Sequence, residues 1–296
     1  MTIWNLGSIN ADHVYDLPHL PAPGETLAAT RLTTGLGGKG ANMSVACARA
    51  GARIMHIGAV GPDGAWAAQR LLEYGVDTRC IHTGTTPTGH AIIAVDPQGE
   101  NNILLFTGAN RDIPLAVVED ALSQAQTGDW FVTQNETNHQ AQAMTLARDM
   151  GLRTAYAAAP FDAAAVQAVM ALTDLLILNA VEAEQLRAAT GLAPAALPVA
   201  DVIVTLGGDG ATWFANRTGA SRHFAAIPVT PVDTTGAGDT FTGYVLAGLD
   251  RALPMAQAIG LAMRAGALMV TRHGAADVIP DLAEVTAFRA QGHHDD

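Results

Sequence analysis

The sequence is poor in cysteine, in aromatic residues and in charge. Its 296 residues include only two cysteines, Cys47 and Cys80, and their spacing matches no common metal-binding motif. The simplest interpretation excludes a disulfide framework, and we expect both side chains to fill small spaces in the core of a reduced, cytoplasmic protein. Met1 to Asn10 contains neither a basic region nor an apolar stretch, so we expect no secretory signal there.

Long apolar runs and net positive charge are also missing. No stretch of about 18 apolar residues is free of charge or proline, so we expect no membrane span. The formal net charge of −12 argues against nucleic acid or an anionic membrane as a partner. It does not argue against phosphate ligands, because glycine loops and helix N-termini bind phosphate without net positive charge. We expect the tail His293 to Asp296 to be disordered.

Hydrophobic residues make up 49% of the chain, which is enough for a large core. From Pro114 onward, apolar patterns with helical spacing alternate with short apolar runs typical of buried strands. Such alternation indicates parallel strands joined by helical crossovers. The sequence therefore predicts a single α/β domain over residues 1–296, with an open, mainly parallel central sheet flanked by helices. The clearest predicted elements are helices at 115–125, 138–150 and 254–270 and strands at 3–6, 130–133, 154–157, 175–178 and 202–205.

Two further segments predict a small β-sheet beside this domain. The runs 89–95 and 102–106 are joined by Asp96-Pro97-Gln98-Gly99, which is a hairpin signal with turn residues at its tip. We expect segments of about 10–36 and 86–108 to form a lid over the ends of the central strands. A lid of this kind excludes water from a reacting group.

The most informative stretch of the chain runs from Val232 to Gly243. Gly236 and Gly238 allow the backbone to turn sharply and to approach a ligand closely. Asp239 then falls in the first turn of a predicted helix, whose free N–H groups form an anion site. An aspartate in this position can also be simply a helix cap. The apolar face that predicts the helix consists of Phe241, Tyr244, Val245 and Leu249.

A second glycine-rich stretch, Gly35 to Gly40, matches the Gly-x-Gly-x-x-Gly dinucleotide fingerprint and opens another predicted helix. Asp63 lies about where an acidic ribose ligand would stand, so an NAD-dependent dehydrogenase is one alternative. Against it, the loop follows a proline-rich segment instead of the first strand of a βαβ unit. It is not a Walker loop either, because Gly40 stands where a Ser or Thr would hold magnesium.

Polar side chains follow several of the predicted strands. Asn10 and Asp12 come after the first strand, Glu136 after the strand at 130–133, and Asn179 and Glu182 after the strand at 175–178. Ligands of open α/β sheets bind at the carboxyl ends of the strands, which makes Asn10 and Asp12 candidate binding groups. The alternatives are turn formation for the first two, capping of the next helix for Glu136, and an ordinary first-turn position for Glu182.

Both glycine-rich stretches resemble signature motifs of the ribokinase-like (phosphofructokinase-B) family of carbohydrate kinases. Asp-Thr-Thr-Gly-Ala-Gly-Asp-Thr-Phe, from Asp233 to Phe241, resembles the C-terminal motif of the family. Gly-Gly-Lys-Gly-Ala-Asn-Met-Ser, starting at Gly37, resembles its N-terminal motif. The resemblance implies transfer of a phosphoryl group from ATP to a primary hydroxyl of a small sugar, and an open sheet with a lid through which related kinases often form homodimers.

The resemblance also implies roles for individual residues. Asp239 would be the catalytic base, beside the backbone N–H groups of Gly236, Ala237 and Gly238. Asn179 and Glu182 would lie at the nucleotide, with Glu182 holding Mg²⁺ through water, and Thr205 and Gly207 would line the nucleotide site. The implied substrate-binding residues are Asn10, Asp12, Gly37, Gly38, Lys39, Asn42 and Glu136.

A potassium site is implied by the C-terminal segment Thr271-Arg272-His273-Gly274-Ala275. The implied ligands are Asp233, Thr235, Met269, Arg272 and Gly274. Val278 departs from the family pattern, which offers a serine hydroxyl there, so we expect a weak K⁺ site.

The substrate implied by the resemblance is D-ribose, giving ribose 5-phosphate, because Gly7 to His13 and the Thr-Arg-x-Gly-Ala segment are most similar to the ribose-phosphorylating members. Three alternatives stay open at this point. The first is a kinase of the same fold for another sugar, a ketose derivative or a nucleoside. The second is a sugar- or nucleotide-binding regulator without turnover, and the third is the dehydrogenase.

Overall fold

The computed structural model describes residues 1–288, so the prediction for His293 to Asp296 lies outside the described part. Within it, the main sheet has nine strands in the order β13-β12-β11-β10-β9-β8-β1-β4-β5. The pairs from β11 through β10, β9, β8, β1 and β4 to β5 are parallel, and β12 and β13 are added antiparallel at one edge. The strands are β1 (Thr2–Leu6), β4 (Arg53–Val60), β5 (Asp77–Thr83), β8 (Trp130–Gln134), β9 (Arg153–Ala157), β10 (Leu175–Asn179), β11 (Asp201–Thr205), β12 (Ala211–Ala215) and β13 (Ala220–Phe224).

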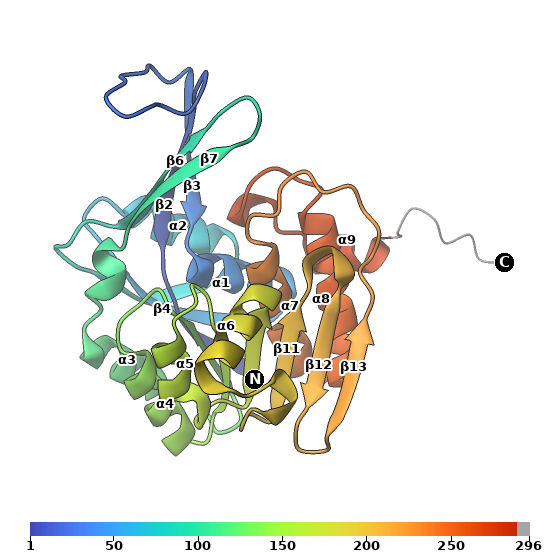
Figure 1. The fold of residues 1–296 in the computed structure, drawn as a ribbon. Coiled ribbons are helices and arrows are strands. Elements are labelled where there is room, and N and C mark those ends of the chain that lie inside the picture. The colour runs from blue at the N-terminus through green and yellow to red at the C-terminus, as the bar shows by residue number, and fades with distance from the viewer. Residues whose placement is uncertain (289–296) are drawn as a thin grey trace.

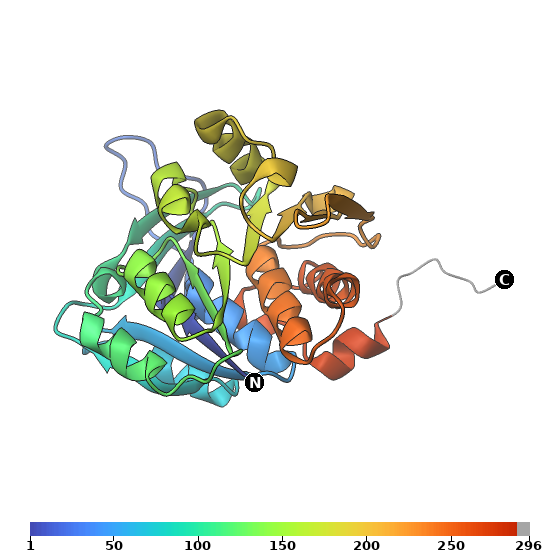
Figure 2. The same ribbon diagram turned by 90° about the horizontal axis from the view of Figure 1, so that it is seen from below.

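Helices cover both faces of this sheet, as Figure 2 shows. Successive residues of a buried strand point to opposite faces, so Ile3 packs into one hydrophobic cluster and Trp4 into the other. On the Ile3 face lie α1 (Lys39–Arg49), α2 (Ala65–Glu73), α7 (Ala237–Asp250), α8 (Met255–Met269) and α9 (Leu282–Ala287). On the Trp4 face lie α3 (Leu115–Leu122), α4 (Gln140–Asp149), α5 (Ala163–Met170) and α6 (Ala180–Thr190).

A second, four-stranded sheet has the order β3-β2-β6-β7 and projects from the body of the molecule in Figure 1. We call it the small sheet; its strands are β2 (Asn10–Asp16), β3 (Arg31–Gly37), β6 (Gly89–Val95) and β7 (Asn101–Phe106). Large apolar side chains of this sheet remain exposed, among them Leu104 at 65% and Ile103 at 54%. The predicted fold class, a mainly parallel α/β sheet with an additional small sheet, is confirmed.

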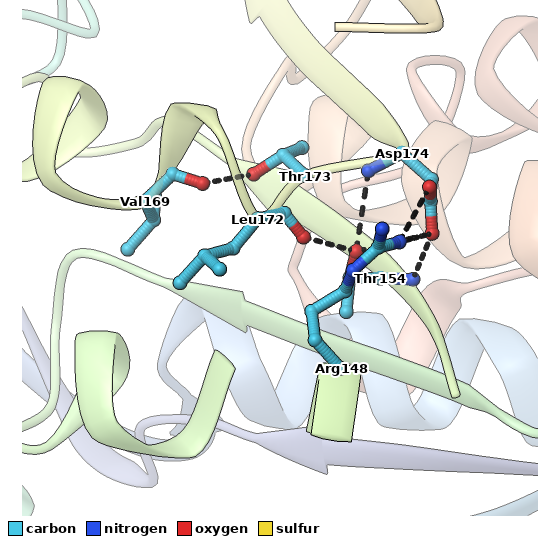
Figure 3. Close-up of polar contacts among 6 residues, drawn as sticks. All are labelled: Arg148, Thr154, Val169, Leu172, Thr173 and Asp174. Atoms are coloured by element: carbon cyan, nitrogen blue, oxygen red, sulfur yellow. Dashed lines mark hydrogen bonds and ion pairs between the residues drawn. The ribbon is translucent and has the colours of Figure 1, made fainter. Parts of the chain in front are cut away.

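An ion-pair network fixes the connection from α5 into β10 (Figure 3). Both carboxylate oxygens of Asp174 accept hydrogen bonds from Arg148 Nη1, at 2.7 and 2.8 Å. Asp174 Oδ2 also accepts from the backbone N–H of Thr154 at 3.0 Å, and Thr173 Oγ1 donates to the Val169 carbonyl. These contacts lie at the amino end of β10, away from Asn179 at its carboxyl end, and their role is to anchor the strand.

Candidate active site

The candidate site lies where α7 begins, beside the carboxyl ends of the parallel strands. Gly236 is the N-cap of α7 with φ of 73°, a left-handed conformation that favours glycine. The N–H of Ala237 donates to the Thr234 carbonyl at 3.2 Å. Among the described residues, the N–H groups of Gly236 and Gly238 have no hydrogen-bond partner. The predicted anion site therefore has two free backbone donors and a third in a long hydrogen bond.

Asp239 is buried in the first turn of α7, with 7% of its surface exposed. Its Oδ2 accepts a hydrogen bond from Asn42 Nδ2 of α1 at 2.9 Å. Burial raises the pKa of Asp239 to about 6, and the charge of Lys39 opposes that increase. A carboxylate with such a pKa is ionised at neutral pH and is close to the range in which it accepts a proton efficiently.

The contact between Asn42 and Asp239 depends on a close crossing of α1 and α7 at Gly243. A Cβ atom on Gly243 would lie 2.5 Å from the Cβ of Ala46 and 2.8 Å from the carbonyl oxygen of Met43. Only a residue without a side chain permits this approach, because real Cβ atoms do not tolerate such distances. The sequence analysis did not assign Gly243 this role.

Two adjoining cavities flank the start of α7. The first, of about 380 Å³, brings together Lys39, Asn179, Glu182, Gly236 and Asp239. The second, of about 480 Å³, is mostly apolar and shares Thr205, Thr234 and Gly238 with the first. The polar cavity suits phosphates, and the apolar one suits a flat aromatic base. Gly207 lies in the second cavity, as the nucleotide assignment of Thr205 and Gly207 requires.

A second carboxylate with a raised pKa is that of Asp12, on β2 of the small sheet. Burial, together with the nearby charge of Glu136, raises its pKa to about 6. Within residues 1–288 its carboxylate has no hydrogen-bond partner, and it lies directly over Gly37, where a Cβ would come within 2.0 Å of Oδ2. Asn42 Oδ1 is likewise buried without a partner in the described chain. These acceptors would be satisfied by hydroxyl groups of a ligand.

Glu136 joins the turn at Ser8 to the start of α1 at Lys39 instead of capping a helix. It accepts hydrogen bonds from Ser8 Oγ and, at 3.0 Å, from the backbone N–H of Lys39. The alternative that it caps the next helix is wrong, because α4 begins after His139 without a side-chain cap. Lys39 lies among carboxylates, and Asp239 is the main reason that its pKa is raised, followed by Glu136 and Glu182.

Asn179 and Glu182 form a reciprocal capping box at the start of α6. Asn179 Oδ1 accepts from the Glu182 N–H at 2.8 Å, and Glu182 Oε2 accepts from the Asn179 N–H at 2.8 Å. The ordinary first-turn interpretation of Glu182 is therefore correct, and it does not exclude a functional one. Oε1 of Glu182 takes no part in the capping box, and the residue lines the same cavity as Asp239. Burial raises the pKa of its carboxyl group.

A magnesium ion at Glu182 would need ligands from outside the protein. Among residues 1–288, no group of three or more His, Cys, Asp or Glu side chains is arranged to hold a metal ion. Mg²⁺ commonly uses one or two carboxylates together with phosphate oxygens and water, and one free oxygen of Glu182 meets that need.

The five residues considered for potassium fall into two hydrogen-bonded sets. Asp233 accepts from the N–H groups of Thr235 at 2.9 Å and Gly274 at 3.1 Å. The Met269 carbonyl accepts from the Arg272 N–H at 3.0 Å, and the Met269 side chain lies 3.4 Å from where a Cβ of Gly236 would stand. Val278 packs beside Gly274 and offers only hydrocarbon there. The arrangement fits a cation bound by backbone oxygens, with one polar ligand fewer.

A buried polar network beneath the Gly37–Gly40 loop was not predicted from the sequence. Asn5 Nδ2 donates to the Gly40 carbonyl and to Ser44 Oγ, both at 2.8 Å. His56 lies at 2.8 Å from Ser44 Oγ through Nδ1 and at 3.0 Å from the Gly7 carbonyl through Nε2. A carbonyl oxygen can only accept, so Nε2 carries the proton, and burial lowers the pKa of His56 to about 4. The network therefore fixes the backbone at Gly7 and at Gly40 through a neutral histidine.

The structure contradicts the dehydrogenase interpretation. Gly35 to Gly37 are the last residues of β3 in the small sheet, so α1 follows a strand of the small sheet and not one of the main sheet. Asp63 is already engaged, since its Oδ1 accepts from the N–H and the hydroxyl of Thr88 at 2.9 and 2.8 Å. It fastens two loops together and does not face a dinucleotide site.

Comparison with known proteins agrees with this geometry. The profile described as "pfkB family carbohydrate kinase" matches residues 3–282, so the chain belongs to this family of carbohydrate kinases. A ribokinase of Haemophilus influenzae is 35% identical over 305 residues, covering 97% of this chain and 98% of that one. A ribokinase of Staphylococcus aureus is 33% identical, covering 95% and 97%.

Solved structures show the same fold. The ribokinase of Cryptococcus neoformans in complex with ADP superposes with a TM-score of 0.82 at 29% identity, covering 96% of this chain and 98% of that one. The ribokinase of Arabidopsis thaliana complexed with ribose and ATP gives 0.83 at 26% identity, covering 97% and 99%. Within the described residues, no helix combines the length and apolarity needed to cross a bilayer.

Proposed function

We propose that this chain transfers the γ-phosphoryl group of ATP to the primary hydroxyl of D-ribose, giving ribose 5-phosphate and ADP. The observation that carries the proposal is the placement of Asp239, a buried carboxylate beside free backbone N–H groups in a polar cavity. Family membership and the ribokinases among its relatives support the same conclusion.

In the proposed reaction Asp239 accepts the proton of the primary hydroxyl. The oxygen of that hydroxyl forms a bond to the γ-phosphorus as the bond from this phosphorus to the bridging oxygen breaks, and that electron pair leaves with ADP. Backbone N–H groups of Gly236, Ala237 and Gly238 stabilise the charge on the transferred group, which is the main requirement of phosphoryl transfer.

The sugar would lie between the Gly37–Gly40 loop and the Gly236–Gly238 loop. Asp12 and Asn42 Oδ1 supply acceptors without protein partners in the described chain, and Glu136 stands beside Asp12. Gly38, at φ of 93°, lets the Gly37–Gly40 loop pass close to the backbone of Ser8, because a Cβ there would lie 2.9 Å from the Ser8 carbonyl oxygen. The proposed sugar-binding residues remain Asn10, Asp12, Gly37, Gly38, Lys39, Asn42 and Glu136.

The nucleotide and its cations would occupy the other side. The triphosphate would run past Asn179 and Glu182, and the base would lie in the apolar cavity near Thr205 and Gly207. When bound, Mg²⁺ would supply positive charge to the phosphates, held through water by Glu182. Asp233, Thr235, Met269, Arg272 and Gly274 would hold K⁺.

The small sheet would be the lid and the surface for forming a homodimer in a cytoplasmic enzyme. Its exposed apolar residues include Leu32, Ile103, Leu104 and Leu105, each more than half exposed. Exposed apolar side chains on both edge strands, β3 and β7, would be covered if the small sheet packs against a second copy. Leu104→Glu should convert a dimer to a monomer in sedimentation velocity, whereas Leu72→Glu, on exposed α2, should not; a wild-type monomer would refute the dimer.

The decisive experiment is a coupled ADP-release assay across ribose, deoxyribose, fructose, adenosine and aldonates. We expect the highest kcat/KM with ribose, and ³¹P NMR should place the phosphate on the primary carbon. Asp239→Asn should lower kcat by about 10² to 10⁴, the usual contribution of a positioned base. ADP release that is highest with another acceptor would reject ribose, and full turnover by a folded Asp239→Asn protein would reject the mechanism. Sugar binding without turnover in the wild type would favour a regulator.

A further inference from the structure

Asn110 holds the side chain of Asn10 in one defined orientation. It lies in the 3₁₀ turn Gly108–Arg111 directly after β7, and only 2% of its surface is exposed. The backbone N–H of Ile9 donates to the side-chain oxygen Oδ1 of Asn110 at 2.8 Å. A backbone N–H cannot accept a hydrogen bond, so the atom that faces it must be oxygen. The amide orientation of Asn110 follows from this contact.

The orientation of Asn10 follows in turn. With Oδ1 turned to Ile9 N, the Nδ2 of Asn110 donates to the Ile9 carbonyl at 3.2 Å and to Asn10 at 2.7 Å. The atom of Asn10 at the end of that short contact must be its oxygen, because two NH₂ groups cannot hydrogen-bond. Nδ2 of Asn10 therefore points elsewhere, and within residues 1–288 it donates to no protein atom.

The surroundings leave this pair little freedom to rearrange. Asn10 is 5% exposed and lines a cavity of about 320 Å³ together with Asn110 and Glu136. Gly89 backs both amides, since a Cβ there would come within 2.2 Å of Asn110 Nδ2 and 2.5 Å of Asn10 Oδ1. The free NH₂ group of Asn10 and the free carboxylate of Asp12, both on β2, thus offer complementary polarity.

We propose that Asn110 is a positioning residue for the acceptor sugar, which acts by making Asn10 present a hydrogen-bond donor and not an acceptor. This inference rests on the proposed sugar kinase function. One sugar hydroxyl can then accept a hydrogen bond from Asn10 while another donates to Asp12. An ionised carboxylate can only accept, so the two residues recognise the hydroxyls in opposite ways. Asn110 itself does not need to touch the substrate.

The polarity of the contact can be reversed by Asn110→Asp, which preserves the shape of the side chain. An aspartate would still accept from Ile9 N–H and would lose the weaker bond to the Ile9 carbonyl. Its second oxygen would need a donor from Asn10, which would turn the Asn10 oxygen towards the sugar. We expect the KM for ribose to rise about tenfold, the effect of one lost hydrogen bond. The KM for ATP should change by less than about twofold on the same grounds. Asn110→Ala, as a second variant, should also raise the KM for ribose selectively.

A double-mutant cycle with Asn10→Ala separates positioning from mere structure. If Asn110 acts through Asn10, then Asn110→Asp should raise the KM for ribose in the wild type and have almost no further effect in the N10A variant. Equal effects in both backgrounds would overturn the inference and leave the proposed function intact. No effect of Asn10→Ala on the KM for ribose would remove Asn10 from the sugar site and overturn the inference, whereas the proposed function fails only if ribose is not the preferred acceptor in the ADP-release assay.

Asn216→Ala is the matched control, because it removes another asparagine side chain that is hydrogen-bonded to the backbone. Asn216 Nδ2 donates to the carbonyls of Pro194 and Leu197 at 3.0 and 3.1 Å, outside the cavities described above. We expect this variant to lower the melting temperature as Asn110→Ala does, without changing the KM for ribose. A rise in that KM in the control as large as in Asn110→Ala would show a general loss of stability and overturn the inference.

Discussion

Asn42 Nδ2 donates to Asp239 Oδ2 at 2.9 Å, although the two residues are 197 positions apart in the chain. The first belongs to the helix that follows the glycine loop of the small sheet, and the second to the helix that begins at the anion site. This hydrogen bond leaves Asn42 Oδ1 without a protein partner in the described chain. A single amide thus orients the proposed base and offers an acceptor to the proposed sugar.

The rate of the reaction should depend on the ionisation of Asp239. Because its pKa is raised to about 6, a pH below about 6 protonates the base. We expect kcat/KM to fall about tenfold per pH unit below about pH 6, measured in constant-ionic-strength buffers, because kcat/KM reports ionisation of the free enzyme. The Asp12→Asn variant should keep this acidic limb even if its KM is higher. A flat profile down to pH 5 in the wild type would exclude Asp239 as the base.

The same buried charge should cost stability. A carboxyl group whose pKa is higher in the folded than in the unfolded state binds more protons when folded, so stability falls as pH rises between the two pKa values. For Asp239 this interval runs from about 4 to about 6. At pH 7.5, Asp239→Asn should therefore be more stable than the wild type, by at most about 3 kcal/mol.

Chemical denaturation at two pH values checks this prediction. The gain in the free energy of unfolding should shrink at pH 4, where the wild-type carboxyl group is protonated in the folded state. The side-chain oxygen of the amide in Asp239→Asn can still accept from Asn42, so the hydrogen bond is conserved. A variant that is less stable than the wild type at pH 7.5 would contradict the assignment of a costly buried charge.

Gly243→Ala tests the crossing of α1 and α7. The added methyl group would overlap Ala46 and the Met43 carbonyl, so the helices must separate, at a cost of about 1–3 kcal/mol. Because Asn42 and Asp239 lie one turn away, kcat should also fall. Gly260→Ala in α8 is the control, since its Cβ would meet nothing within 4 Å and a helical alanine is favoured by up to about 1 kcal/mol. Similar melting temperatures for the two variants would refute the argument.

Potassium should activate this protein only weakly. Val278 places hydrocarbon beside Gly274, where a hydroxyl would complete the proposed site. Rates in K⁺ and Na⁺ buffers of equal ionic strength should differ little in the wild type, and Val278→Ser should increase the ratio of the two rates. Val278→Ala, which adds no oxygen, should leave the ratio unchanged. A strong potassium dependence of the wild-type rate would show that the site is complete without a side chain at this position.

The sequence predicted the parts of the fold that have a local signature. The helix at 254–270 is observed as α8, Met255–Met269, and the strand at 175–178 as β10, Leu175–Asn179. The α5 helix was missed because Ala163-Ala164-Ala165 carries no amphipathic period. The edge hairpin β12–β13 was missed because its strands are half exposed and have no regular alternation.

For the site, the sequence identified the groups but not their partners. Asp239 could be placed at a helix start from the glycines before it and the apolar face after it, yet its bond to Asn42 depends on the tertiary crossing at Gly243. Asn110 and His56 carried no signal at all, because each acts through contacts with Ile9, Asn10 or Gly7 that lie far away in the chain. A capping box and a metal ligand also look alike in sequence, and Glu182 shows that they can coincide in space.

The side chains proposed to hold the sugar lie between Asn10 and Glu136, whereas those proposed for the nucleotide and its cations lie from Asn179 to Gly274. This division along the chain has an evolutionary consequence. Mutations in the first half of the gene could change the alcohol acceptor without altering the side chains proposed for the nucleotide, provided that Asn42 keeps its hydrogen bond to Asp239. Recombination near the middle of the gene would join an acceptor half from one ancestor to a donor half from another.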